Sequence, residues 1–176
     1  MVERLASEEG IKLRSRESRS RVGRGTVEGA RVLLALPQTL MNASGEAVFA
    51  LCKSNGIEPS DVCIVFDEVA LPLGTLRLRA RGSAGGQKGM ASIISSLGTT
   101  EIPRLRLGVR GERYSRQRDL ADYVLEPFAK EERDVFDGAV ERAVDALRLW
   151  LSDGIDAAMK SANAKPPSPE PDSGPD

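Results

Sequence analysis

Residues 62–89 carry the sequence VCIVFDEVALPLGTLRLRARGSAGGQKG, the most informative stretch of this chain. Residues 62–66 are all apolar, and such a short run is typical of a strand buried on both faces. Asp67 follows this run directly and is expected to lie at the end of the strand. Leucine and arginine alternate over residues 76–79, which predicts a strand with one exposed face. Three glycines within residues 82–86 predict a flexible loop before the next helix.

Strands and helices alternate along the rest of the chain. The hydrophobic pattern predicts strands at residues 20–26, 31–36, 62–66, 76–79 and 105–109. It predicts helices at residues 1–9, 44–56, 89–97 and 131–151, and a shorter helix from Asp156 onward. Asn42 or Ser44 can cap the second of these helices. This order predicts an α/β fold, with a mixed sheet and helices on both of its faces.

The length of the chain predicts one domain, because 176 residues fall within the usual size of a single core. We place this domain at residues 1–164. Residues 165–176, KPPSPEPDSGPD, contain five prolines in twelve residues. Such a composition cannot bury enough apolar surface to fold, so we expect a disordered tail.

The composition excludes several classes of protein. Hydrophobic residues make up 40% of the chain, and no apolar run approaches the roughly 20 residues of a membrane span. The first residues have no signal-peptide pattern, so we expect a cytoplasmic protein without a membrane contact. Cys52 and Cys63 are expected to be buried free thiols, because two cysteines without histidine are too few for a metal site.

Charge is segregated along the chain although the net charge is only −1. Residues 76–118 hold ten Lys and Arg against two acidic residues, and residues 12–24 hold six against Glu17 alone. Residues 126–156 hold nine acidic residues against four basic ones. Basic segments of this kind indicate a polyanionic partner such as nucleic acid. A mixed, solvated surface is the alternative interpretation.

Four separated segments together resemble one family. They are LPQTLMNASGEAV (residues 36–48), VFDEVALPLGTLRLRARGSAGGQKGM (65–90), LGTTEIPRLRLGV (97–109) and DYVLEPFAKEE (122–132). In this order and spacing they resemble bacterial peptidyl-tRNA hydrolase over residues 1–163. The resemblance implies a single α/β domain around a mixed twisted sheet. It also implies hydrolysis of the ester bond between a peptide and the 3′ ribose of tRNA, by a monomer without metal or cofactor.

The resemblance also assigns roles to individual residues. Asp67 matches an aspartate that orients a catalytic histidine, and a carboxylate can fix the tautomer of an imidazole in this way. Asn42 matches a substrate-binding asparagine, and Leu40 belongs to the same substrate-binding segment. Lys88 stands where the family binds substrate with an asparagine. The partner implied is the acceptor end of peptidyl-tRNA. Without the resemblance, Asp67 is a strand-end cap and Asn42 a helix cap.

Three positions depart from the family pattern. Gln87 replaces a histidine, Lys88 replaces an asparagine, and Ala70 stands where many members carry aspartate. Lys88 keeps the polarity of its position and adds a positive charge, so a phosphate contact remains available. The same loop does not fit a nucleotide-binding phosphate loop, because Lys88 neither follows a glycine nor precedes Ser or Thr.

The start of the sequence is the largest departure, since residues 1–176 contain no histidine. Family members begin with a strand, an Asn-Pro-Gly turn and a Thr-Arg-His-Asn segment that carries the catalytic histidine. The first residues here resemble the helix that follows this histidine. We therefore expect the first strand of the fold and the catalytic histidine to be missing, and hydrolysis to be impaired. The alternative is a non-catalytic homologue that binds tRNA or another RNA.

Overall fold

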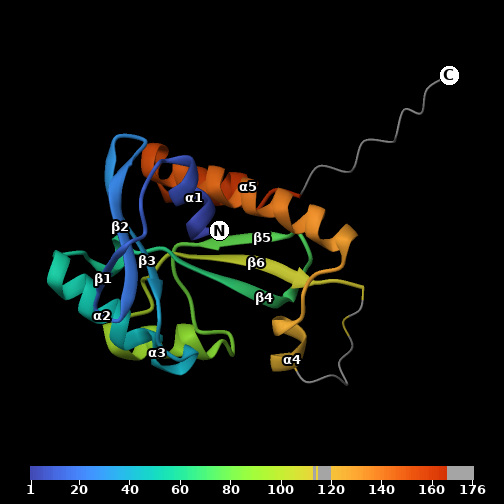
Figure 1. Ribbon diagram of the computed structural model, residues 1–176, viewed down its shortest axis with the longest axis horizontal. Coiled ribbons are helices and arrows are strands. Elements are labelled where there is room, and N and C mark those ends of the chain that lie inside the picture. Colours follow the sequence, from blue (N-terminus) through green and yellow to red (C-terminus); the bar gives the residue numbers. More distant parts are fainter. Residues whose placement is uncertain (113, 115–119, 166–176) are drawn as a thin grey trace.

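The computed structural model describes residues 1–112, 114 and 120–165, and Figure 1 shows its elements. The helices are α1 (Val2–Glu8), α2 (Ser44–Asn55), α3 (Lys88–Leu97), α4 (Leu120–Leu125), α5 (Lys130–Asp153) and α6 (Ile155–Ala162), with short 3-10 turns η1 (Met41–Ala43) and η2 (Pro59–Asp61). The strands are β1 (Ser15–Glu17), β2 (Ser20–Val27), β3 (Ala30–Pro37), β4 (Ile64–Pro72), β5 (Leu76–Arg79) and β6 (Arg104–Arg110). Strands and helices alternate as predicted.

The described strands form two sheets. The first is antiparallel, with the order β1-β2-β3. The second has the order β4-β6-β5 and is mixed, because β4 runs parallel to β6 and β5 runs antiparallel to it. The two sheets lie side by side with their strands in different directions (Figure 1). The predicted mixed sheet is thus present as one of two small sheets, because β3 and β4 do not pair with each other.

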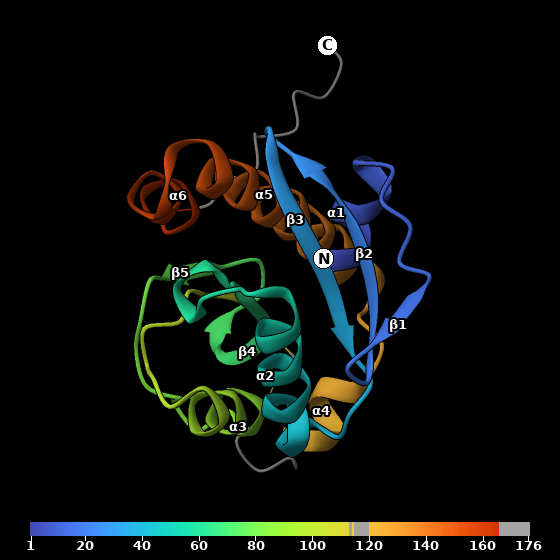
Figure 2. The ribbon, with the colours of Figure 1, turned by 90° about the vertical axis from the view of Figure 1, so that its left-hand side faces the viewer.

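Helices cover both faces of the second sheet, as expected. On one face, the leucines of β5 and β6 pack against the apolar side of α5 in the larger of two apolar clusters. On the other face, Ile64 and Phe66 of β4 pack in a smaller cluster with Met90 and Ile93 of α3 and with Val48 of α2. Figures 1 and 2 show α5 on the far side of this sheet from α3. The alternation of side chains along each strand separates these two layers.

Two strands are less buried than their sequences predict. Residues 32–36 of β3 and residues 62–66 at the start of β4 are all apolar, yet each of them is only half-buried. The expectation that residues 62–66 are buried on both faces is therefore wrong for the described chain. The reason is that β3 pairs only with β2, and β4 only with β6. Each strand keeps one open edge among the described residues, and its apolar side chains are incompletely covered there.

The helix boundaries follow the predicted stop signals more closely than the predicted caps. Gly56 and Gly98 end α2 and α3 in the left-handed conformation, with φ of 63° and 68°. The predicted cap of α2 is wrong, because Ala43 occupies the N-cap position without a side-chain hydrogen bond. Asn42 lies instead within η1, and the Ser44 hydroxyl donates to the Met41 carbonyl.

Other expectations have mixed outcomes. Cys52 is buried and Cys63 is half-buried, and both are free thiols. Burial raises the pKa of Cys63 to about 12.

Within the part of the chain that the structure describes, no helix is long and apolar enough to cross a membrane. The predicted disordered tail, apart from Lys165, lies outside the described residues, as do the basic residues Arg113, Arg116 and Arg118. The domain boundary at residue 164 stays a prediction.

Candidate substrate-binding site

The structure brings together two segments that the sequence separates by more than forty residues. Met41 of η1 packs on the start of α3, where its sulfur fills the position that a β-carbon on Gly89 would take. The Gln87 side-chain amide donates to the Met41 sulfur at 3.6 Å. Residues 40–42, which we call the substrate segment, therefore lie beside Gln87, Lys88 and Gly89.

The contact between α2 and α3 holds this arrangement. A β-carbon on Gly45 would lie 2.2 Å from the Ser92 carbonyl oxygen, so the two helix backbones touch at this point. The Gly45 amide donates to the Ser92 hydroxyl at 3.0 Å. Because α2 begins directly after the substrate segment, this close approach fixes the segment against α3.

Residues 82–87, which we call the glycine loop, connect β5 to α3. Gly85 and Gly86 have φ of 58° and 87°, values that favour glycine. Gln87 ends the loop and caps α3, since its side-chain oxygen accepts from the Met90 amide at 2.8 Å. Lys88 begins the helix and is exposed. Gln87 thus has a structural role at the position where the family pattern has histidine.

Leu40 and Asn42 both point to solvent. Leu40 is 77% exposed. Asn42 is exposed, and its amide makes no hydrogen bond to any other residue that the structure describes. Both side chains are therefore available to a ligand, and Lys88 lies next to Gly89, the residue on which Met41 packs.

Asp67 lies within β4 rather than at its end, because the strand continues to Pro72. Its carboxylate is exposed and accepts no hydrogen bond from another described residue. Alternation along the strand puts Asp67 on the same face as Val65, which packs in the α5 cluster. Phe66 faces α3 instead. Asp67 is therefore on the side of the sheet that carries α1 and α5, and its side chain makes no hydrogen bond or ion pair with the substrate segment, all of whose residues the structure describes.

Four arginines lie on the α3 side of the second sheet. Arg77 is directly opposite Arg106, and Arg79 is directly opposite Arg104, across the β5–β6 pair. We call these four residues the arginine face. Like charges placed opposite each other are destabilising unless an anion compensates them. The Arg106 Nε atom is buried without a hydrogen-bond partner among the described atoms, and Arg106 Nη1 lies 3.5 Å from a carboxylate oxygen of Glu68.

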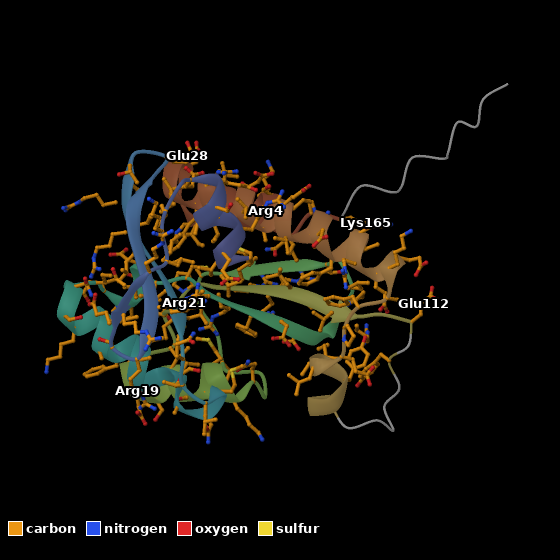
Figure 3. The ribbon with its side chains drawn as sticks, in the orientation of Figure 1. Arg4, Arg19, Arg21, Glu28, Glu112 and Lys165 are labelled. Carbon is orange, nitrogen blue, oxygen red and sulfur yellow. The ribbon has the colours of Figure 1, made fainter. Side chains whose placement is uncertain are left out.

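Three of the six basic residues in the second basic segment, residues 12–24, form ion pairs within the protein. Arg19 pairs with Glu46, Arg21 with Glu3, and Arg24 with Glu17. Figure 3 shows Arg19 and Arg21 projecting from the first sheet. The arginine face is therefore the stronger candidate for binding an anion.

Arg104 differs from the other three arginines because it is buried, with 4% of its surface exposed. The sequence placed it among the surface basic residues. Alternation along β6 distinguishes the arginine side from the leucine side. It does not show which of two arginines on one side is covered by a loop, so the role of Arg104 could not be predicted.

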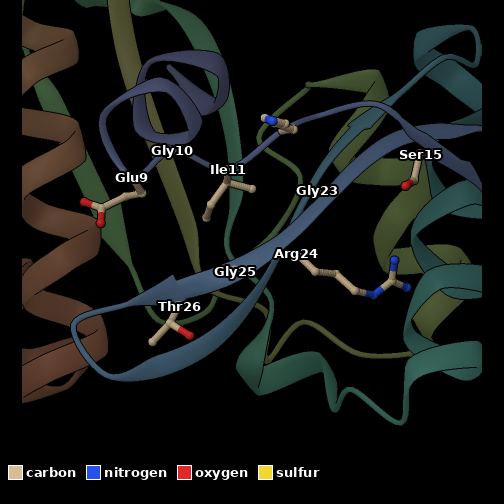
Figure 4. A pocket seen from close by; sticks show the side chains of 9 residues that line it. Glu9, Gly10, Ile11, Ser15, Gly23, Arg24, Gly25 and Thr26 are labelled. Atoms are coloured by element: carbon tan, nitrogen blue, oxygen red, sulfur yellow. The ribbon is translucent and has the colours of Figure 1, made fainter.

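An open hollow of about 460 Å³ lies apart from this site, between the turn after α1 and strand β2 (Figure 4). Two of the three charged residues that line it are already paired, since Glu9 accepts from Arg148 and Arg24 donates to Glu17. Ile11 fills the space above Gly23 and Gly25. The hollow shares no residue with the substrate segment or the glycine loop, so we assign it no part in the site.

Comparison with known proteins identifies the family. A family model described as peptidyl-tRNA hydrolase matches residues 1–170. The chain belongs to the peptidyl-tRNA hydrolase family. A peptidyl-tRNA hydrolase of Chloroflexus aggregans is 44% identical over 163 residues, covering 92% of this chain and 86% of the relative. One of Roseiflexus castenholzii is 43% identical over 171 residues, covering 97% of this chain and 79% of the relative.

Solved structures show the same fold. A crystal structure of peptidyl-tRNA hydrolase in complex with N-propanol is 34% identical, with a TM-score of 0.86 over 95% of this chain and 84% of the other. The enzyme from Acinetobacter baumannii is 33% identical, with a TM-score of 0.85 over 93% of this chain and 82% of the other. The predicted resemblance and the predicted α/β class of the peptidyl-tRNA hydrolase fold are therefore confirmed.

Proposed function

We propose that this chain acts in the hydrolysis of peptidyl-tRNA, freeing tRNA for translation, and that its site binds the acceptor end of the tRNA. The observation that carries this proposal is the contact between the substrate segment and the start of α3 in a member of the peptidyl-tRNA hydrolase family. A cytoplasmic monomer that uses no cofactor fits this role. The relatives are named as hydrolases, so the comparisons lend nothing to a non-catalytic RNA-binding role.

Within this proposal the substrate segment and Lys88 bind the end of the substrate. An exposed asparagine amide can donate to an ester carbonyl or phosphate and accept from a peptide N–H. The exposed Leu40 offers an apolar surface to the peptide or the terminal base. Lys88 supplies a positive charge at the first turn of α3, where backbone N–H groups also attract anions.

Asp67 would orient the histidine that the family uses as general base. Residues 1–176 contain no histidine, so this base is not among them. Met1 packs against the same α5 cluster as Val65, which shares its face with Asp67. A histidine carried just before α1 would therefore enter the molecule on the side where Asp67 lies. We propose that residues 1–176 bind the substrate but cannot activate water efficiently.

Arg77 and Arg106 of the arginine face would bind a phosphate of the tRNA backbone. A phosphate here would offset the repulsion between Arg77 and Arg106 and accept from the exposed part of the Arg106 guanidinium, whose side chain is 30% exposed. Binding of RNA phosphates by Lys and Arg releases counterions, so affinity falls as salt rises.

A salt titration with an acceptor-stem RNA tests this function. We expect Arg106→Glu and Lys88→Glu each to weaken binding and to flatten the slope of log affinity against log salt by about 0.7–0.9 per lost phosphate contact. Arg31→Glu is the matched control, because Arg31 is exposed at the tip of the β2–β3 hairpin. Slopes for Arg106→Glu and Lys88→Glu equal to that of the unmodified chain would exclude both residues as phosphate contacts.

A further inference from the structure

The buried Arg104 guanidinium makes four hydrogen bonds, all of them to backbone carbonyls. Its Nη1 atom donates to Gly82 at 2.6 Å and to Ser83 at 2.9 Å. Its Nη2 atom donates to Thr100 at 3.1 Å, and its Nε atom donates to Ile102 at 2.8 Å. No carboxylate contacts it among the described residues. Burying a charged side chain costs free energy, and the hydrogen bonds to these carbonyls offset that cost.

These carbonyls come from the two segments that precede and follow α3, and the first of them leads into the substrate site. Gly82 and Ser83 open the glycine loop, whereas Thr100 and Ile102 belong to the connection between α3 and β6. The Gly82 amide also donates to the Thr100 carbonyl at 3.2 Å. Arg104 thus joins the start of the glycine loop to the connection that follows α3.

The glycine loop is fixed at both ends, and between them Ala84 packs in the smaller apolar cluster. Arg104 holds Gly82 and Ser83, and Gln87 caps α3 at the other end. Between these anchors, Gly85 and Gly86 are exposed and adopt positive φ. Glycine has the largest backbone freedom of any residue, so the anchors determine how far the loop can move.

We infer that Arg104 is a positioning residue for the substrate site: it holds the glycine loop so that Lys88 and the first turn of α3 face the substrate segment. Arg104 is buried and does not touch the substrate itself. Its effect on tRNA binding rests on the proposed function, whereas its hydrogen bonds to the glycine loop do not depend on tRNA. A planar guanidinium can reach four carbonyls at fixed angles, whereas a lysine ammonium has three donors and no fork.

Hydrogen exchange of the full chain carrying Arg104→Lys tests the inference without tRNA. We expect amide exchange at residues 83–88 to become about 10- to 100-fold faster, because hydrogen bonds from a charged group to the loop are lost. Exchange in β4 and β6 and the global unfolding midpoint should change much less. Arg81→Lys is the control, since Arg81 is 73% exposed and only pairs loosely with Glu101. Unchanged exchange at residues 83–88, or equal acceleration throughout the sheet, would overturn the inference.

Acceptor-stem RNA binding then tests the consequence for the site. We expect Arg104→Lys to weaken binding about 3- to 10-fold while leaving the salt slope unchanged, because preorganisation is lost but no phosphate contact is. A reduced slope would make Arg104 a direct phosphate contact and contradict the inference. Failure of the unmodified chain to bind RNA would contradict the proposed function, and the exchange measurement would still decide the role of Arg104.

Discussion

Single glycines determine how closely the elements of this molecule approach one another. A β-carbon on Gly45 would lie 2.2 Å from the Ser92 carbonyl oxygen, and one on Gly108 would lie 2.0 Å from the Pro72 carbonyl oxygen. Both obstacles are backbone atoms, which cannot move without shifting a helix or a strand. The α2–α3 contact that supports the substrate segment therefore depends on the absence of a side chain at residue 45.

Gly45→Ala should destabilise the chain, with a loss of about 1–3 kcal/mol in the free energy of unfolding, because it forces overpacking against backbone. Gly138→Ala is the matched control within α5. There the nearest atom to a new β-carbon is Arg142 Nη1 at 3.7 Å. This second change should stabilise by up to about 1 kcal/mol, through helix propensity. Chemical denaturation measures both, and equal effects of the two substitutions would contradict the predicted clash.

Glu17 gives the stability of the chain a dependence on acid. Hydrogen bonds from Arg24, Asn55 and Ser54 lower the pKa of Glu17 from 4.5 to about 2. A carboxyl group whose pKa is lowered by folding stabilises the fold above its unfolded pKa and loses this contribution as the pH falls toward its folded pKa. The contribution is therefore complete above about pH 5 and disappears between pH 4.5 and 2.

Glu17→Gln should lower the melting temperature at neutral pH, and the difference from the unmodified chain should shrink toward zero near pH 2. Thermal melts at a series of pH values measure this difference. The same comparison in an Arg24→Met background is the control, because Arg24 is the largest cause of the lowered pKa. A difference that stays constant from pH 7 to pH 2 would exclude the proposed linkage.

Among helices and strands, the sequence predicts the features that a local hydrophobic pattern determines. It does not predict the features that depend on contacts with residues far away in the sequence. Helix α5 was predictable because its apolar periodicity and acidic first turn extend over many residues. Strand β1 and turn η1 were missed because each has three residues, too few to show a period. The half-burial of β3 and β4 was not predictable, because it depends on which strand lies beside each edge.

The candidate site, too, was predictable only in part. The resemblance supplied residues 40, 42, 67 and 88. The contact of Met41 with Gln87 and Gly89 joins segments far apart in the sequence, so only the fold reveals it. The position of Asp67 within β4 was missed because residues 67–72 lack the uninterrupted apolar run that marks the start of this strand.

Asn163, just after α6, closes the outer edge of β5 with its side chain. Its amide oxygen accepts from the Leu78 N–H at 2.8 Å, and its amide nitrogen donates to the Leu78 carbonyl at 3.0 Å. Asn163→Ala leaves both backbone groups unpaired at a strand edge. We expect a loss of about 1–3 kcal/mol in the free energy of unfolding. The exposed Lys160→Ala on α6 is the control, and a similar change in both variants would contradict this role for Asn163.

At the scale of the whole molecule, the open edges of β3 and β4 are the main weakness. Apolar runs on both strands are only half-buried, and unpaired strand edges promote aggregation. A further strand that buried three aliphatic side chains would add about 5–9 kcal/mol to the free energy of unfolding. The total stability of a domain is typically only about 5–15 kcal/mol, so such a strand would change the stability of the molecule substantially.

We therefore expect residues 1–176 alone to be poorly soluble or loosely packed. Fusion of a family-type strand, turn and His-containing segment before Met1 should raise the melting temperature markedly. Calorimetry of both proteins, with a fused polar linker of equal length as the control, measures the difference. Cooperative unfolding of residues 1–176 as a soluble monomer at an ordinary mesophilic temperature would show that these edges need no further strand.

Single-turnover hydrolysis of an N-acylated aminoacyl-tRNA by residues 1–176, with and without added imidazole, tests whether these residues bind the substrate but lack the general base. Loss of a general base reduces a rate by about 10²–10⁴-fold. We therefore predict that residues 1–176 hydrolyse the substrate at least about 100-fold more slowly than a full-length relative. Imidazole should raise the rate by replacing the base, and Asp67→Asn should abolish this increase. A rate without imidazole equal to that of the full-length relative would show that another residue of the chain activates water, and would contradict the account.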